Sequence, residues 1–223
     1  LTKNSSGTLT LSGANNYTGT TTLNAGTLRA TTSAQALGAG ALTLAGGELQ
    51  LANNSGLNFG RNTTVTGATT ITSDVLAASA GVTHTLGTLS IGAQTLTVNA
   101  GTNATSGTAG LTFGATTLTG GATFNSNTGV LTTLGNVSGV GQALTVGGAG
   151  DTIFSGAVNV ANAALNNTAG TVSFLGDVTV TTALTTASNA FNVSLTGGTN
   201  SIAGTTTFAN TGTLQLGDAA GDV

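Results

Sequence analysis

The feature that most constrains this chain is a short alternating strand pattern that returns from one end of the sequence to the other. In Thr8-Leu9-Thr10-Leu11-Ser12, leucines alternate with hydroxyl residues, and this period of two sends one set of side chains into a core and the other to solvent. Repetition of one short strand predicts an elongated stack of similar units. The pattern returns in five later segments: Ala41-Leu42-Thr43-Leu44, Gln94-Thr95-Leu96-Thr97-Val98, Thr117-Leu118-Thr119, Ala143-Leu144-Thr145-Val146 and Thr213-Leu214-Gln215-Leu216.

Glycine and asparagine at the breaks indicate how the strands are joined. None of the 36 glycines follows Asn or Asp, although Asn-Gly and Asp-Gly are the strongest signals for a two-residue hairpin. Leu96, Leu118 and Leu144 lie 22 and 26 residues apart, which is near the coil length of a three-faced solenoid. The sequence therefore predicts an all-β fold: a parallel β-solenoid, with a right-handed three-faced β-helix favoured, of about ten or eleven coils and roughly 50 Å in length.

The composition leaves little chemistry available. Charged residues make up 4% of the 223 residues, against about 25% in an ordinary soluble domain. Three basic residues, Lys3, Arg29 and Arg61, with a net charge of −3, cannot neutralise a run of phosphates, which argues against nucleic acid as a partner. No apolar run approaches the roughly 20 residues of a membrane-spanning helix, so membrane insertion by this segment is not expected. We expect residues 1–223 to form a single continuous solenoid segment of a longer repeat array.

Enzymatic chemistry is not predicted. Glycoside cleavage needs paired carboxylates, or a strong base beside stabilising charge, and the acidic residues are scattered along the chain. His84 could join Asp74 and a hydroxyl in a Ser-His-Asp set, or could point inward with Leu86, but a solvated histidine is favoured. No catalytic residue is therefore assigned. The acidic residues are Glu48, Asp74, Asp151, Asp177, Asp218 and Asp222.

Two kinds of ligand site are weakly indicated. Asp151 follows a Gly-rich stretch similar to a calcium-binding repeat turn, but no second copy lies one coil away, so a plain turn is favoured; Asp218 and Asp222 are the one other local acidic pair. Threonine runs such as Thr20-Thr21-Thr22 suggest an ice-binding array, yet their spacing is irregular and Thr suits strands in any case. No metal and no cofactor is expected.

Local patterns assign individual side chains. Leu118 and Val146 are predicted to point inward and Thr119 outward, and the seven Phe are the bulky core candidates. Segments 31–38 and 73–81 each combine Ser or Thr as an N-cap candidate, good helix formers and a C-terminal Gly. Each segment therefore predicts a single helical turn at a corner.

Residues 1–51 resemble a known repeat family. The resemblance is to the autotransporter-associated β-strand repeat, also called the passenger-associated transport repeat, in which Tyr17 is expected to be a corner packing residue. Residues 52–223 continue the rhythm as more divergent coils. The resemblance implies a secreted bacterial surface protein whose passenger is a β-helix exported by type V secretion. It is carried by Leu1-Thr2-Lys3, Gly7-Thr8-Leu9-Thr10-Leu11, Asn16-Tyr17-Thr18-Gly19, Asn24-Ala25-Gly26-Thr27-Leu28 and Ala36-Leu37-Gly38.

The expected function is structural: a fibrous, surface-exposed passenger or stalk segment of an autotransporter-like adhesin. A self-stacking extracellular filament subunit is the alternative, and ice-binding or polysaccharide-active β-helices are remote ones. The expected partners are a second copy end to end, neighbouring repeats of the parent chain, or host-cell, matrix or glycan surfaces. The expected location is extracellular or at the bacterial cell surface.

Overall fold

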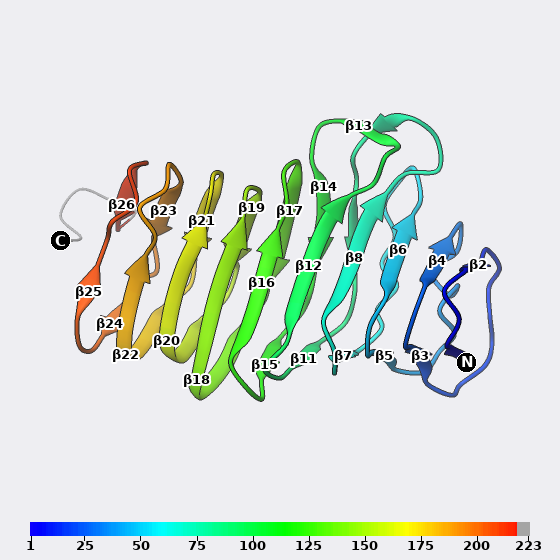
Figure 1. Cartoon of the computed structure of the whole chain (residues 1–223), viewed down its shortest axis with the longest axis horizontal. Coiled ribbons are helices and arrows are strands. Elements are labelled where there is room, and N and C mark those ends of the chain that lie inside the picture. Colours follow the sequence, from blue (N-terminus) through cyan, green and yellow to red (C-terminus); the bar gives the residue numbers. More distant parts are fainter. Residues whose placement is uncertain (218–223) are drawn as a thin grey trace.

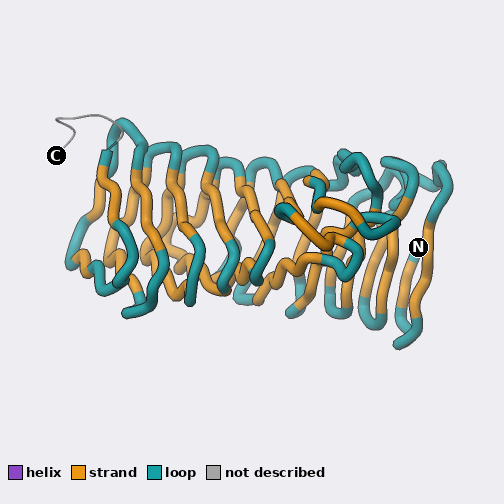
Figure 2. The backbone as a smooth tube through the Cα atoms, turned by 90° about the horizontal axis from the view of Figure 1, so that it is seen from above, coloured by secondary structure: helices purple, strands orange, loops and turns teal. Residues whose placement is uncertain are grey.

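The chain folds as a parallel β-solenoid. The computed structural model describes residues 1–217, whose strands stack coil upon coil along one long axis (Figure 1). The strands of all three sheets pair in parallel, and no helix occurs in this range (Figure 2). The predicted all-β class and parallel solenoid are therefore confirmed. The right-handed turn of the coil stays a prediction, which the general preference for right-handed parallel crossovers supports.

The first face of the rod carries one short strand from each coil. Most of these strands have three residues with a buried, outward, buried pattern, so each exposes one side chain. The first-face strands are β1 (Thr2–Lys3), β3 (Thr21–Leu23), β5 (Leu42–Leu44), β7 (Thr63–Val65), β11 (Leu89–Ile91), β15 (Thr116–Leu118), the first halves of β18 (Val137–Gly148), β20 (Val158–Asn167) and β22 (Val178–Thr186), and β24 (Ser201–Ile202).

The second face continues from the first around a corner. In β18, β20 and β22 the strand runs through the corner with a register shift, so the two faces form one 17-stranded sheet. The second-face strands are β2 (Thr8–Leu11), β4 (Thr27–Thr31), β6 (Glu48–Ala52), β8 (Thr69–Asp74), β12 (Thr95–Ala100), β16 (Ala122–Ser126), the second halves of β18, β20 and β22, and β25 (Thr206–Thr207).

The third face is a sheet only in the later coils. In the first coils this side is a stack of loops, joined by backbone bonds such as Asn15 N–H to Gln35 O (3.2 Å) and Ala39 N–H to Tyr17 O (2.9 Å). The prediction of three β faces therefore holds from β10 onward. The third-face strands are β10 (Thr83–Thr85), β14 (Ala109–Thr112), β17 (Val130–Leu134), β19 (Asp151–Phe154), β21 (Thr171–Phe174), β23 (Asn192–Leu195) and β26 (Leu214–Leu216).

One apolar core runs through the coils. Buried Leu, Val, Ile, Phe and Ala side chains from Leu23 to Leu195 form a single contact cluster. Within it Phe154 and Phe174, from adjacent coils, stack with ring centroids 4.6 Å apart. The predicted inward positions Leu118 and Val146 are buried. Six of the seven Phe are fully buried, and Phe208 packs partly buried against the cluster.

A two-stranded overhang interrupts the rod at one place. Residues 75–82 and 101–108 leave the second face after β8 and β12, carry β9 (Ser79–Ala80) and β13 (Ala104–Ser106), and return to the third face. Figure 1 shows these two arms rising above the coils as one projecting unit. We call this unit the overhang.

The two predicted helical turns had different outcomes. At 31–38 the chain makes one tight turn, in which Ser33 Oγ accepts from Gln35 N–H (3.1 Å) and Ala36 N–H bonds Ser33 O (3.0 Å). At 73–81 the prediction is wrong, because this stretch is the end of β8 and the first arm of the overhang. Its amides at Leu76 and Ala77 bond the Asn54 side-chain oxygen instead of a preceding carbonyl.

Candidate functional site

Asp74 lies at the base of the overhang and holds both of its arms. It is the last residue of β8 and is buried. Its Oδ1 accepts hydrogen bonds from Val75 N–H (2.9 Å) and Asn103 N–H (3.1 Å), which are the points where the two arms leave the rod. Asn103 in turn donates its side-chain amide to Val75 O (3.0 Å). One carboxylate thus ends two strands that are 29 residues apart along the chain.

His84 lies directly beneath Asp74 in the core. Its side chain is 0% exposed, so the expectation of a solvated histidine is wrong. Nδ1 accepts from Leu57 N–H (3.0 Å), and Nε2 lies 3.0 Å from the Asp74 carbonyl oxygen. The Phe59 ring packs against it with centroids 5.9 Å apart. Burial lowers the pKa of His84 below 6.5, outweighing its backbone hydrogen bonds and the Asp74 charge, which raise it.

These residues do not form a hydrolytic triad. His84 bonds the Asp74 backbone and not its carboxylate. The neighbouring Ser73 hydroxyl donates to Gly110 O (2.9 Å) and lies 3.3 Å from Val82 O, and it is buried with no exposed surface. A nucleophile needs its base within reach and access to substrate, and this arrangement offers neither.

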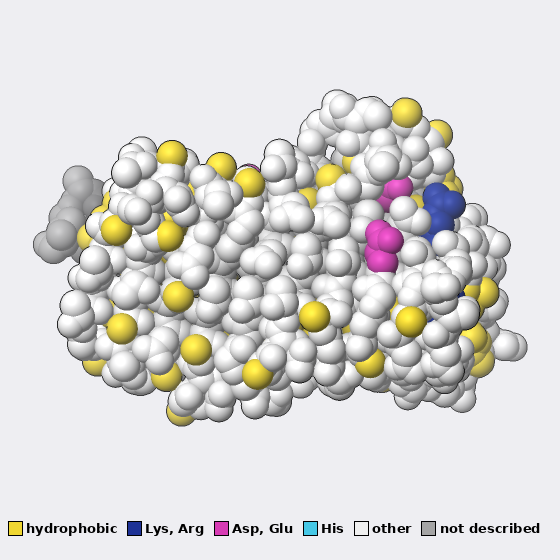
Figure 3. All heavy atoms as spheres, viewed as in Figure 1, with side chains coloured by type: hydrophobic (Ala, Val, Ile, Leu, Met, Phe, Trp, Pro, Cys, Tyr) yellow, Lys and Arg dark blue, Asp and Glu magenta, His cyan; other side chains and the backbone are white. Residues whose placement is uncertain are grey.

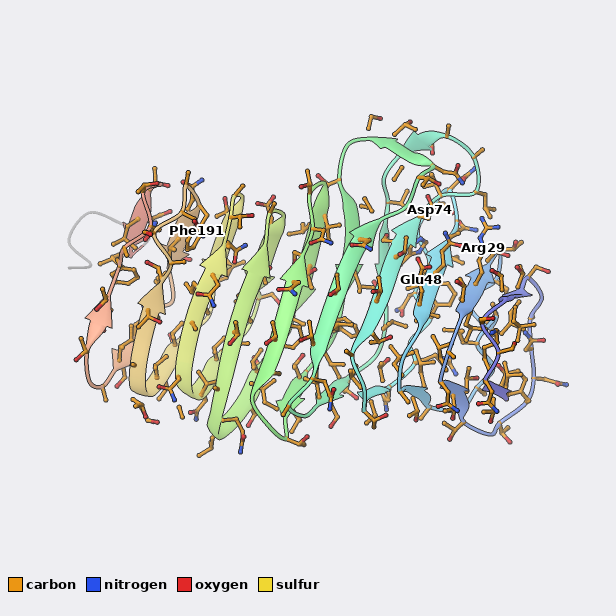
Figure 4. The ribbon with its side chains drawn as sticks, in the orientation of Figure 1. Arg29, Glu48, Asp74 and Phe191 are labelled. Carbon is orange, nitrogen blue, oxygen red and sulfur yellow. The ribbon has the colours of Figure 1, made fainter. Side chains whose placement is uncertain are left out.

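Charged side chains gather beside the overhang. On the face shown in Figure 3, Asp or Glu atoms and Lys or Arg atoms lie close together at one place, next to the overhang. Figure 4 places Arg29, Glu48 and Asp74 there, on β4, β6 and β8. Glu48 bridges three coils, because its carboxylate accepts from Thr72 Oγ1 (2.5 Å) and Thr27 Oγ1 (3.4 Å).

Arg29 is held between neighbours without a partner for one of its nitrogens. It pairs in register with Gln50, whose side-chain amide reaches Asp74 Oδ2 at 3.4 Å. The Arg29 Nε is buried and makes no hydrogen bond. This corner of the second face is therefore the most polar surface of a rod that otherwise carries hydroxyl and amide groups.

A ladder of hydroxyl groups runs along the whole first face. Each member pairs in register with the member on the next coil, and consecutive strands lie about 4.8 Å apart. The ten members, here called the hydroxyl ladder, are Thr2, Thr22, Thr43, Thr64, Ser90, Thr117, Ser138, Asn159, Thr179 and Ser201.

The threonine runs considered for ice binding do not share one plane. Thr22 lies on the first face, Thr85 on the third, and Thr97 and Thr207 on the second. The ladder draws one residue from each coil, and several of its members are not in any threonine run. Sequence reasoning missed it because its members, 20 to 27 residues apart, had no shared local pattern.

The other acidic positions are structural where they are described. Asp151 opens β19 and its Oδ1 accepts from Thr171 N–H on the next coil (2.8 Å). Asp177 does the same for Thr199 N–H (2.8 Å). Within residues 1–217 no three His, Cys, Asp or Glu side chains come together as a metal site. Asp218 and Asp222 lie outside the described residues.

Tyr17 packs at a corner as expected. Its hydroxyl lies 2.8 Å from Thr21 Oγ1, which donates to Leu37 O. Its ring covers Gly38 on the next coil, where a Cβ would meet the ring at 2.2 Å and where φ is +74°. The glycine of the Ala36-Leu37-Gly38 corner is therefore required both for its left-handed conformation and for the space it leaves.

Comparison with known families gives one match. A family model, the passenger-associated-transport-repeat, matches residues 1–30, which cover β1 to most of β4. This repeat and the parallel solenoid together fit an autotransporter passenger repeat protein, a class that is secreted or displayed at the cell surface. Searches of curated proteins and of solved structures found no match. No helix of residues 1–217 has the length and apolar character needed to cross a membrane.

Proposed function

We propose that this chain is a rigid stalk segment of a bacterial autotransporter-like adhesin, exposed at the cell surface and non-enzymatic. The observation that carries the proposal is the unbroken register of the hydroxyl ladder over ten coils. A stack that adds one in-phase strand per coil, around one continuous core, is suited to holding two points at a fixed distance. The absence of an accessible nucleophile beside His84 supports a structural role.

The test is a pair of deletions in the full-length parent protein. Removing residues 138–178 joins Val137 to Thr179 and keeps the ladder in phase, because Ser138 and Thr179 occupy the same column. We expect the protein to reach the cell surface with a rod shorter by about 10 Å, two strand spacings, as measured by small-angle scattering of the purified rod. Adhesion of the cells should persist at reduced strength.

The control deletion removes residues 138–168 and joins Val137 to Ala169. It brings the start of a third-face strand to the position of a first-face strand, so folding and display should fail. If the in-phase deletion abolished adhesion while display stayed normal, the deleted coils would themselves be the binding surface and the spacer role would be wrong.

A filament subunit is a second candidate, favoured by the ends of the rod. Among the described residues β1 pairs only with β3, and β26 only with β23, and Leu214 and Leu216 are 42% and 44% exposed. Unpaired edges and exposed core residues can receive the strands of a second copy. In that case the purified chain forms rods whose lengths step by about 50 Å in electron micrographs, whereas a stable monomer at high concentration would exclude the filament.

A further inference from the structure

His84 is the one histidine of the chain, and it joins three segments at the base of the overhang. It lies in β10, accepts from Leu57 in the loop between β6 and β7, and bonds the carbonyl of Asp74 at the end of β8. The loop is otherwise attached to β10 through Phe59 N–H to Thr85 O and Thr85 N–H to Leu57 O, both 2.9 Å. The histidine therefore sits where the regular coil gives way to the overhang.

The hydrogen bonds of His84 fix its protonation state. Leu57 N–H is a donor, so Nδ1 must carry a lone pair, and the Asp74 carbonyl is an acceptor, so Nε2 must carry the proton. The neutral imidazole satisfies both partners. An added proton on Nδ1 would face the Leu57 N–H, and the bond between them would be lost.

We propose that His84 is an acid-sensitive latch, whose protonation releases the loop of residues 53–62 from the core and loosens the base of the overhang. Phe59, which is fully buried against His84, would then become exposed. At neutral pH the latch is closed.

The charged groups around the latch are few. Asp74, on β8, is the acidic group near the ring and favours the charged imidazole. Arg61 lies on the loop itself, where its Nε donates to Phe59 O (2.6 Å), and it disfavours a second positive charge nearby. From β14, which pairs with β10, the facing residues are Gly110, Leu111 and Thr112, none of which titrates.

The sign of the pH dependence follows from the lowered pKa. Because the folded state binds the proton less readily than the unfolded chain, the contribution of His84 to stability is complete above the ordinary pKa of 6.5. It decreases as the pH falls from that value to the folded-state pKa. Below 6.5 we therefore expect the open loop to gain population by up to about tenfold for each pH unit.

The test is hydrogen exchange with mass spectrometry on the complete chain, at about pH 7.5 and about pH 5. Exchange is expressed as protection relative to the intrinsic rate at each pH. In the wild type, the protection of peptides covering residues 53–62 should fall about tenfold or more between the two conditions, while peptides of β20 and β22 stay protected. Unchanged protection at residues 53–62 would overturn the latch.

Two variants separate the latch from general acid unfolding. His84→Gln offers one donor and one acceptor but does not titrate, so its protection at residues 53–62 should not depend on pH. Asp74→Asn keeps the Oδ1 acceptor for Val75 and Asn103 but removes the charge that favours imidazolium, so the opening should move to lower pH. The same pH dependence in His84→Gln as in the wild type would contradict the proposal.

A measurement on the wild type keeps the proposal testable if a variant fails to fold. With one histidine, the imidazole nitrogens give a single pair of NMR signals. We expect the Nε2–H tautomer at neutral pH and a pKa below 6.5. An Nδ1–H tautomer, or a pKa at or above 6.5, would show that the latch does not exist.

Discussion

Leu118 and Thr117 are adjacent in β15 and point to opposite sides of the wall. Leu118 is 4% exposed, and Gly139 on the next coil leaves it space, since a Cβ there would lie 2.9 Å from the Leu118 side chain. Alternation alone predicted which of these side chains is buried. It could not decide His84, because a single His between two Thr residues does not reveal its register, and the core partners Leu57 and Asp74 are 27 and 10 residues away.

A charge at Leu118 should unfold the coil locally. We expect Leu118→Asp to lower the free energy of unfolding by several kcal/mol, because it leaves a charge unpaired in a narrow core. Thr119→Asp, on an exposed neighbour, should cost under about 1 kcal/mol. Urea unfolding followed by circular dichroism compares them, since the chain has no Trp. A tolerant Leu118 would mean that the assigned facing of β15 is reversed.

At the scale of elements, the overhang depends on one contact between distant segments. Asp74 and Asn103 are brought together by coil stacking, so the local pattern at 73–81 looked like a short helix and predicted one. The tight turn at 31–38 was predictable because its bonds, from Ser33 to Gln35 and Ala36, are within four residues. What sequence reasoning finds here is what is decided locally.

Removing the Asp74 acceptor should detach the overhang. Asp74→Ala leaves the amides of Val75 and Asn103 without their partner, at about 1–3 kcal/mol for each buried group. Asp74→Asn retains the oxygen and should cost less at neutral pH. Hydrogen exchange of the Val75 and Asn103 amides reports the effect directly. Equal protection in the Ala variant and the wild type would show that β9 and β13 hold together without the carboxylate.

At the scale of the whole molecule, the coil length is regular except at the overhang. Thr22, Thr43 and Thr64 follow at 21 residues (43 − 22 and 64 − 43), whereas Ser90 and Thr117 follow at 26 and 27 (90 − 64 and 117 − 90). The two long coils are the ones that contain residues 75–82 and 101–108. The period in the sequence looked loose because anchors such as Leu96 and Leu118 belong to different faces.

Stability of the rod should not depend on calcium. The described acids hold backbone amides or hydroxyls on neighbouring coils instead of converging on one point. We expect the melting temperature, followed by circular dichroism, to agree within about 2 °C between millimolar calcium and chelator. A shift above roughly 10 °C, a few kcal/mol of linkage, would establish a structural metal site and return attention to Asp151.

The hydroxyl ladder has a consequence for how such a gene can change. A regular coil begins and ends in the same column, so a stretch of DNA that encodes one coil can be duplicated or lost without turning any neighbouring side chain inside out. A gain or loss of one residue inside a strand would instead reverse its buried and exposed positions. Alleles of the parent gene are therefore expected to differ by whole coils, so that recombination adjusts the reach of the protein in steps while its outer surface stays the same.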